Sequence, residues 1–500
     1  MKQPVSVSGE VTRSFKKEHA LGLSVLLLFS VLIVYLKIFQ YPFIQDDWYI
    51  LHSLKAMGTG EFIARAFIGV EGVFYRPVAA LYMAFIYSIF GMEPTGFHFF
   101  ALMLHGINAL IVAAITFKLI QRIEIAWGAG FLYALSASLH LDSLLWFVGS
   151  NDILGALFFF STLLFFLQKR IWLSTLCYVL AIFTKEATLL LPGILLFLSI
   201  SMKDNARVNV QGLRHAFLEV KYFIGVAIGY GAIRFNSIVS FSEQTGNPYH
   251  SSLWGTHIVE NISKYVQWSF EGVFPIIVFD SGIWITLVQL VLFFGLAFSL
   301  SGFSLKRNLF FISWIVLGIF PVMFLQDHAF RYYLTYSYPA IAIFGLTIID
   351  EGVEKLKITS KPIIAQIVLL CFLTAGFSWY YFSDLDRQGF DTLTVEGSNN
   401  LIRKGSIVRM LDTFLQKEYP AVPESSVFIF DWLPTEAFGG EKGLSLRYNM
   451  QALSVYEIQA IQADAKGVYP KSNASVMRNY IDPKKIIYIS FHGDRLRRGK

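Results

Sequence analysis

The chain has 500 residues, of which 55% are hydrophobic and only 15% charged, and its formal net charge is +6. Soluble globular domains carry about 25% charged residues, so this composition excludes an ordinary soluble protein. The basic residues fall in short segments between apolar runs, which indicates membrane topology and excludes a nucleic-acid-binding surface.

The first predicted element is a membrane-spanning helix over residues 20–40. Crossing the hydrocarbon core takes roughly 20 residues, and no small-residue cleavage site follows this run, so we expect a retained helix. Asp46 and Asp47 come shortly after it, next to Trp48 and Tyr49, aromatic residues of the kind that favour a membrane interface. Such a pair fits chemistry on an amphiphilic substrate. Taken alone, it also fits a solvated acidic loop.

Short basic clusters separate the other apolar runs. If each cluster is cytoplasmic, the positive-inside rule predicts about eleven spans of alternating direction, with the N-terminus in the cytoplasm. The predicted spans are residues 20–40, 98–118, 124–141, 152–168, 171–184, 187–202, 217–236, 284–303, 309–325, 332–350 and 362–382.

Two apolar stretches do not fit as spans. Residues 78–90 are too few to cross the bilayer, and residues 258–281 are interrupted by charges, so both are predicted to be interfacial segments. With this topology, almost every unusual polar residue lies on the non-cytoplasmic face. A transport pathway would place polar groups near mid-membrane, so the pattern favours an enzyme that works at the outer interface.

The composition becomes polar after the last predicted span. We expect a transmembrane domain over residues 1–383 and a small extracytoplasmic α/β domain over residues 384–500. The predicted fold class is therefore mainly α, a polytopic helical membrane domain with an α/β appendage. Within the appendage, strands are predicted at 425–432 and 485–490, and helices at 402–415 and 453–461.

Polar motifs follow one another in order over residues 20–350. They are Gln45-Asp46-Asp47-Trp48, Tyr75-Arg76-Pro77-Val78, Phe97-His98, Leu104-His105, His140-Leu141-Asp142, Ser150-Asn151-Asp152, Thr184-Lys185-Glu186 and Phe330-Arg331-Tyr332-Tyr333. The ordered set resembles the GT-C glycosyltransferases. It is closest to the protein O-mannosyltransferase-like members and to the transmembrane mannosyltransferases that carry tetratricopeptide repeats, although no such 34-residue repeat follows residue 384.

The resemblance implies an inverting, GT-C-type glycosyltransferase in the cell (inner) membrane. Its partners would be the bilayer, a polyprenyl-phosphate or diphosphate sugar donor, and an acceptor hydroxyl on a glycan, lipid or protein, with no nucleic acid. The family's first-loop carboxylate acts as general base and matches Asp46 or Asp47, with Asp46 slightly preferred by its motif position. Adjacent carboxylates also raise each other's pKa, which suits a base near neutral pH.

The leaving phosphate needs positive charge and hydrogen-bond donors. Arg331 is the first candidate, followed by Arg76 and Lys185. The alternative for Arg331 is a side chain that extends to the lipid headgroups. The alternative for Lys185 is an ion pair with Glu186 at a helix end.

Further residues are candidates for binding the donor or its sugar: Asp152 and Glu186 as second carboxylates, His98 and His140, and the aromatic residues Trp48 and Tyr75. Asp152 also fits a helix cap, and the aromatic residues also fit interfacial anchors. A divalent metal ion is the one possible cofactor, with Asp47 and His98 as its candidate ligands. No His-x-x-x-His or Cys pair supports it.

Two other functions remain open. A transporter or flippase of lipid-linked saccharides would need polar groups within the spans, and a ligase of such saccharides would differ mainly in its acceptor. A non-catalytic scaffold leaves the one-sided set of charges unexplained.

Overall fold

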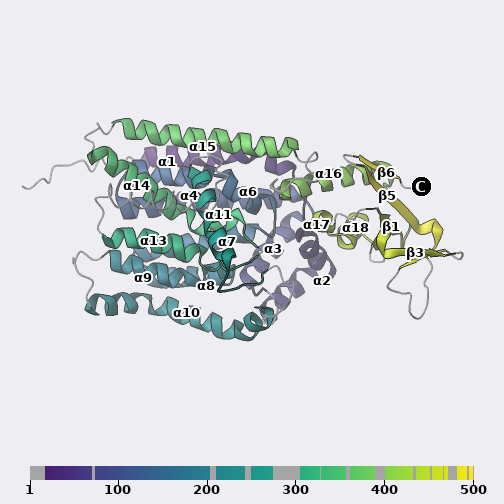
Figure 1. Cartoon of the computed structure of the whole chain (residues 1–500), viewed down its shortest axis with the longest axis horizontal. Helices are drawn as coiled ribbons and strands as arrows, with labels where there is room; N and C mark the ends of the chain where they lie inside the picture. The colour runs from purple at the N-terminus through teal and green to yellow at the C-terminus, as the bar shows by residue number, and fades with distance from the viewer. Residues whose placement is uncertain are drawn as a thin grey trace, which may run out of the picture.

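The computed structural model is mainly helical, with a small sheet near the C-terminus (Figure 1). It describes residues 17–69, 74–202, 210–242, 249–273, 305–326, 328–355, 361–388, 400–431, 435–450, 453–464, 467–470, 481–492 and 495–498.

The described residues up to Gln388 are mainly helical. The helices are α1 (Lys17–Tyr35), α2 (Asp47–Ile68), α3 (Pro77–Phe90), α4 (Pro94–Ile120), α5 (Ile123–Leu135), α6 (Ala137–Leu145), α7 (Ser150–Leu167), α8 (Ile171–Ile182), α9 (Leu191–Ser201), α10 (Val210–Ser242), α11 (Thr256–Val273), α13 (Leu305–Ile319), α14 (Tyr338–Lys355) and α15 (Lys361–Gln388). Short 3-10 helices follow α1 (Leu36–Gln40), precede α9 (Glu186–Leu190) and precede α14 (Arg331–Tyr336).

Four described helices are long and apolar enough to cross a membrane. They cover Ala20–Gln40, Pro94–Ile120, Ser150–Leu167 and Val210–Phe235, in agreement with four of the predicted spans. The predicted spans at 124–141, 171–184, 187–202, 309–325 and 362–382 overlap shorter apolar helices, and the one at 284–303 lies outside the described residues. The chain is therefore a helical protein with membrane-spanning character, and the count of eleven spans stays a prediction.

The predicted helix over 124–141 is wrong in its continuity, because the chain breaks at Ser136 between α5 and α6. The Ser136 hydroxyl donates to the Leu132 carbonyl at 2.6 Å and lies 2.7 Å from the Tyr338 hydroxyl. These side-chain bonds stabilise a break that apolar periodicity does not reveal. The predicted helix over 332–350 likewise begins as the 3-10 helix Arg331–Tyr336 and continues as α14.

The two predicted interfacial segments are helical where they are described. Helix α3 begins with Pro77 in its first turn, a position that does not need a backbone N–H, and α11 covers the first part of 258–281. The structure adds a helix that the sequence pattern did not predict. This is α2, which starts at Asp47 and is kinked at Gly58, where φ is +76°.

The C-terminal region contains a four-stranded sheet in the order β2-β1-β5-β6. Its elements are α16 (Asn400–Glu418), β1 (Val427–Phe430), α17 (Thr435–Phe438), α18 (Glu441–Tyr448), β2 (Ser454–Glu457), β3 (Ile461–Asp464), β4 (Gly467–Pro470), β5 (Ile486–His492) and β6 (Arg495–Arg498). Strand β1 pairs in parallel with β2 and β5, while β5 pairs antiparallel with β6. Strands β3 and β4 form a separate antiparallel hairpin.

The predicted strands at 425–432 and 485–490 and the helix at 402–415 are present, but the helix predicted at 453–461 is wrong. Its first half is β2, in register with β1 through the pair Phe428 and Val455. Pairing with a neighbouring strand overrides a weak helical pattern in a segment that contains Val455 and Tyr456, good strand formers.

The sheet domain lies at one end of the bundle, beyond α2 and α17 (Figure 1). At this end the 3-10 helix after α1 leads into the first loop, residues 41–46, which precedes α2. Ile44 of that loop is fully buried in the same apolar cluster as Phe428 and Phe430 of β1. Helix α15 continues past residue 383 to Gln388, and the predicted division into 1–383 and 384–500 stays a prediction.

Candidate functional site

The two adjacent first-loop carboxylates have opposite environments. Asp46 is exposed, whereas Asp47 is completely buried. They lie at the start of α2, where the N–H groups of Tyr49 and Ile50 each donate to the Asp46 carbonyl at 3.0 Å. The fold therefore separates two residues that are equivalent by sequence.

Asp47 binds backbone groups from two parts of the chain. Its carboxylate accepts from the N–H of Ile44 at 3.0 Å, of Val148 at 3.0 Å and of Phe147 at 3.3 Å. Burial raises the pKa of Asp47 to about 7, and these hydrogen bonds act against that rise. With its oxygens occupied, Asp47 joins the first loop to the turn before α7.

Asp46 keeps its carboxylate accessible. Partial burial raises the pKa of Asp46 above its ordinary value, and the nearby Lys404 charge opposes the rise. Burial raises the pKa of the Tyr249 phenol, which also lies within electrostatic reach of Arg76 and Asp46. Tyr249 therefore lies within electrostatic reach both of Asp46 and of the charged residues described next.

Four predicted site residues form two crossed ion pairs. The Lys185 ammonium lies 2.9 Å from an oxygen of Asp152 on α7, and both side chains are buried. The Arg76 guanidinium binds Glu186 through two nitrogens, with Nε 2.8 Å from Oε2. The neighbours Lys185 and Glu186 thus each pair with a distant residue, which corrects the expectation that they could pair with each other.

Asp152 does not cap α7. The residue before the helix is Gly149, and the Asp152 side chain reaches Lys185 instead. Its second oxygen, Oδ1, is buried without a hydrogen-bond partner in the described part of the chain. The Nε2 atom of His328 is also buried and has no hydrogen-bond partner among the described residues. Buried polar atoms normally have partners, so these two are places where a ligand or water would bind.

Aromatic rings line this group of charges. They belong to Tyr249, His328, Phe330 and Tyr332 and are called the aromatic wall below. Tyr249 and His328 have ring centroids 4.2 Å apart, and Phe330 stacks on Tyr332 at 5.3 Å. The Lys185 ammonium lies 5.9 Å from the centroid of the Tyr332 ring. Burial, followed by the charge of Lys185, lowers the pKa of His328 to about 4, so this imidazole is neutral near pH 7. The result is a mixed polar and aromatic surface of the kind that binds small polar ligands.

Arg331 makes its ion pair elsewhere, with Glu271 of α11. Its guanidinium also lies 5.3 Å from the centroid of the Trp268 ring, and its side chain is 29% exposed. It is thus neither a free side chain in the headgroup region nor a direct partner of Asp152 or Glu186.

The predicted histidines are buried inside the bundle. Both ring nitrogens of His98 contact backbone carbonyls, of Leu144 at 3.1 Å and of Tyr41 at 3.0 Å. His140 packs against the rings of His105 and Tyr133 at centroid distances of 4.7 and 4.5 Å.

The oxygens of Asp47 and the nitrogens of His98 are occupied by backbone groups, so these two residues do not fit the predicted metal ligands. In the ranges that the structure describes, no three His, Cys, Asp or Glu side chains are grouped to hold a metal ion.

The two predicted aromatic residues have structural contacts. Trp48 donates from Nε1 to the Ala437 carbonyl at 3.3 Å, in the contact with the C-terminal domain. Tyr75 donates to the Phe67 carbonyl at 3.1 Å and packs edge-on against Phe183.

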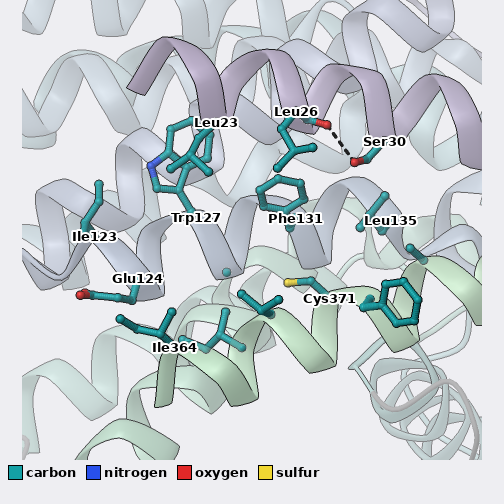
Figure 2. A pocket seen from close by; sticks show the side chains of 15 residues that line it. Leu23, Leu26, Ser30, Ile123, Glu124, Trp127, Phe131, Leu135, Ile364 and Cys371 are labelled. Carbon is teal, nitrogen blue, oxygen red and sulfur yellow. Dashed lines mark hydrogen bonds between the residues drawn. The ribbon is translucent and has the colours of Figure 1, made fainter. Parts of the chain in front are cut away.

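A groove of 440 Å³ lies away from these charges, between α1, α5 and α15 (Figure 2). Its wall is almost entirely apolar: Ser30 donates to the Leu26 carbonyl at 2.8 Å, and Glu124 is the one charged residue that lines it. It contains none of the predicted site residues, and its lining suits hydrocarbon.

Sequence reasoning missed Tyr249, His328, Lys404 and Glu271 as site residues. The paired tyrosines after Arg331 were a usable signal for the aromatic wall. Tyr249 and His328 gave none, because the loops that bring them together are far apart in the sequence and neither lies in a recognisable motif.

No protein-family model matches the chain. No curated protein matches it either. Among solved structures, the oligosaccharyltransferase of Archaeoglobus fulgidus in its apo form matches with a TM-score of 0.45 and 12% identity, covering 88% of this chain and 65% of that chain. The archaeal oligosaccharyltransferase AglB from Archaeoglobus fulgidus, in complex with an inhibitory peptide and a dolichol-phosphate, gives a TM-score of 0.46 and 12% identity, covering 92% of this chain and 67% of that chain. The chain thus spans less than two thirds of the length of the apo protein.

Proposed function

We propose that this chain is a GT-C-type, inverting membrane glycosyltransferase. It would move a sugar from a polyprenyl-phosphate or diphosphate carrier to an acceptor hydroxyl at the non-cytoplasmic face, with Asp46 as the general base. The observation that carries the proposal is that Tyr249 of the aromatic wall lies within electrostatic reach of both the exposed carboxylate Asp46 and the ion pairs Lys185–Asp152 and Arg76–Glu186.

The proposed reaction assigns one proton and one leaving group. Asp46 takes the proton of the acceptor hydroxyl as its oxygen attacks the anomeric carbon of the sugar. The bond from that carbon to the carrier phosphate breaks, and the phosphate leaves with the electron pair. Attack from the side opposite the phosphate inverts the anomeric centre. A carboxylate with a raised pKa is suited to accept the proton, since general bases work best when their pKa approaches the working pH.

Lys185 and Arg76 are the cations that would bind the leaving phosphate. The Lys185 ammonium has three N–H donors, and its bond to Asp152 uses one of them. Arg76 has five N–H donors, and its two bonds to Glu186 leave three of them for the phosphate. The ion pairs fix both cations in place before the substrate binds, and such preorganised charge stabilises a developing anion better than mobile side chains do.

The acceptor and the sugar would meet the aromatic wall. The rings of Tyr249, His328 and Tyr332 offer apolar faces beside polar atoms, which suits a sugar ring with its hydroxyls. Arg331, on the α11 side, would either leave Glu271 to bind the phosphate or stay paired with Glu271 as part of the aromatic wall. The divalent metal ion stays a prediction, and no step is assigned to it.

The test is a transfer assay on the purified full chain in lipid vesicles. Radiolabelled polyprenyl-phosphate mannose and glucose are supplied with a membrane-extract acceptor, and chromatography separates label in the product from label in the carrier. The proposal expects transfer by the wild type and none by the double variant Asp46→Asn/Asp47→Asn. Movement of labelled carrier across the vesicle without product would favour a flippase. Equal transfer by the wild type and a folded double variant contradicts the proposal.

A further inference from the structure

The first loop is held between the bundle and the C-terminal domain. On the bundle side, the Tyr41 carbonyl contacts His98 and Asp47 binds the turn before α7. On the other side, the Gln45 N–H donates to the Ala437 carbonyl at 2.9 Å, and Trp48 donates to the same carbonyl. Helix α18 packs against α2, and Figure 1 shows α17 and α18 at this end of the bundle.

Two glycines allow this close contact. A Cβ at Gly405 of α16 would lie 2.7 Å from the Tyr41 ring, and a Cβ at Gly439 would lie 2.5 Å from Cβ of Trp48. The guanidinium of Arg409, one turn further along α16, lies 4.8 Å from the centroid of the Tyr41 ring. The first loop is thus packed at both ends by the C-terminal domain.

The centre of the loop is held by Lys404. Its ammonium lies 2.5 Å from the Gln45 side-chain oxygen, and only 7% of the residue is exposed. Gln45 has a φ of +53°, a left-handed conformation that is unfavourable for a residue with a Cβ and persists only where its surroundings hold it. Asp46 follows directly, so the Gln45 conformation sets the direction of its side chain.

We infer that Lys404 is a positioning residue of the C-terminal domain that holds the Gln45–Asp46 turn and directs the Asp46 carboxylate toward the acceptor. This inference rests on the proposed role of Asp46 as base. It gives the C-terminal domain a direct part in the site, which the bundle alone would leave incomplete. The titratable groups within electrostatic reach of Asp46 are Lys404 of α16, Asp47 of α2 and Tyr249.

The variant Lys404→Met keeps the side-chain length and removes the charge and the donor. We expect kcat for transfer to fall about 10-fold or more, because small misplacements of a reacting group are costly, while KM for the lipid donor changes little. Since the Lys404 charge lowers the pKa of Asp46, its loss should also move the acidic limb of the pH–rate profile to higher pH. Lys404→Arg should recover part of the rate and most of the pH profile.

The matched control is Lys442→Met, at another lysine of the same interface, whose ammonium lies 4.2 Å from the centroid of the Tyr49 ring. Hydrogen exchange of amides 44–48 gives a readout that does not need activity, and it should accelerate in Lys404→Met only. If Lys404→Met fails to fold, Gln45→Met tests the same contact from the other side. If Lys404→Met shows the same hydrogen exchange as the wild type and the same pH–rate profile as Lys442→Met, the inference is wrong. A wild type that lacks transfer, with exchange still faster in Lys404→Met, would overturn the proposed function alone.

Discussion

The Asp47 carboxylate accepts a hydrogen bond from the backbone N–H of Val148 at 3.0 Å, across 101 positions of sequence. Val148 belongs to the turn that begins α7, and Asp152 lies in the first turn of that helix. The bond therefore fixes the distance between the first loop, which carries Asp46, and the helix that carries Asp152. Asp47 acts on the site through this connection.

The two adjacent aspartates should differ sharply in their effect on transfer. Asp46→Asn keeps size and hydrogen bonding but removes the proposed base, so the rate should fall by a factor of about 100 or more while donor binding is retained. Asp47→Asn should reduce the rate less, because its oxygens bind backbone groups. Glu61→Gln, in an exposed pair with Arg65 on the same helix, is the control. A larger loss for Asp47→Asn would exchange the two roles.

Asp47 should make stability depend on pH. Its pKa in the folded chain is about 7, above its ordinary value of 3.8, so its contribution is fully present below about pH 4 and is lost as pH rises through 7. Thermal unfolding of the wild type and Asp47→Asn in detergent from pH 4.5 to 8 measures this. The wild type should lose stability relative to the variant across that range. Parallel pH curves for the two proteins would contradict the assignment.

The Lys185–Asp152 pair should show strong coupling. Removing one partner leaves a buried charge uncompensated, so Asp152→Asn or Lys185→Met should each destabilise the fold by about 3–5 kcal/mol. The double variant should cost less than the two single variants added together. Denaturant unfolding in a double-mutant cycle tests this, with the exposed Glu61–Arg65 pair as the control, where coupling of about 0.5 kcal/mol is expected. Additive losses at Lys185 and Asp152 would show that the pair is not coupled.

Arg331 is tested through donor binding. If it contacts the carrier phosphate, Arg331→Ala should abolish transfer, and Arg331→Lys should restore only part of it, because lysine lacks the planar fork of guanidinium. Binding of a radiolabelled polyprenyl phosphate to each variant is the measurement. Arg65→Ala, at an exposed arginine, controls for loss of charge. Equal binding by the wild type and both Arg331 variants would rule out this role.

Topology is tested by cysteine labelling in a Cys177→Ser/Cys371→Ser background. An impermeant thiol reagent added to intact cells should label Glu424→Cys in the C-terminal domain and leave Lys118→Cys, at the opposite end of α4 from His98, unlabelled. Both positions are exposed, so access to solvent is matched. The reverse pattern would place the site on the cytoplasmic face.

The sequence alone was sufficient for the helical membrane character, for most helix positions and for two of the strands, because apolar length and periodicity depend on local composition. It also identified Asp46, Arg76, Asp152, Lys185 and Glu186 as candidates, since charges beside apolar runs are unusual. It failed where long-range bonds decide local structure, as at the break at Ser136 and at β2.

Which charged residues pair with one another, and which of the two aspartates is exposed, came only from the tertiary structure. Asp46 and Asp47 are the same residue type at adjacent positions, but Asp47 is the one whose carboxylate binds the backbone N–H groups of Ile44 and of the distant Phe147 and Val148. Lys185 and Glu186 likewise have partners on different elements, Asp152 and Arg76. The contact between Lys404 and Gln45 spans 359 positions. The periodicity of a segment indicates which face of its helix or strand is apolar. Which charged residues meet depends on how the helices and strands pack, and this packing is determined by the whole chain.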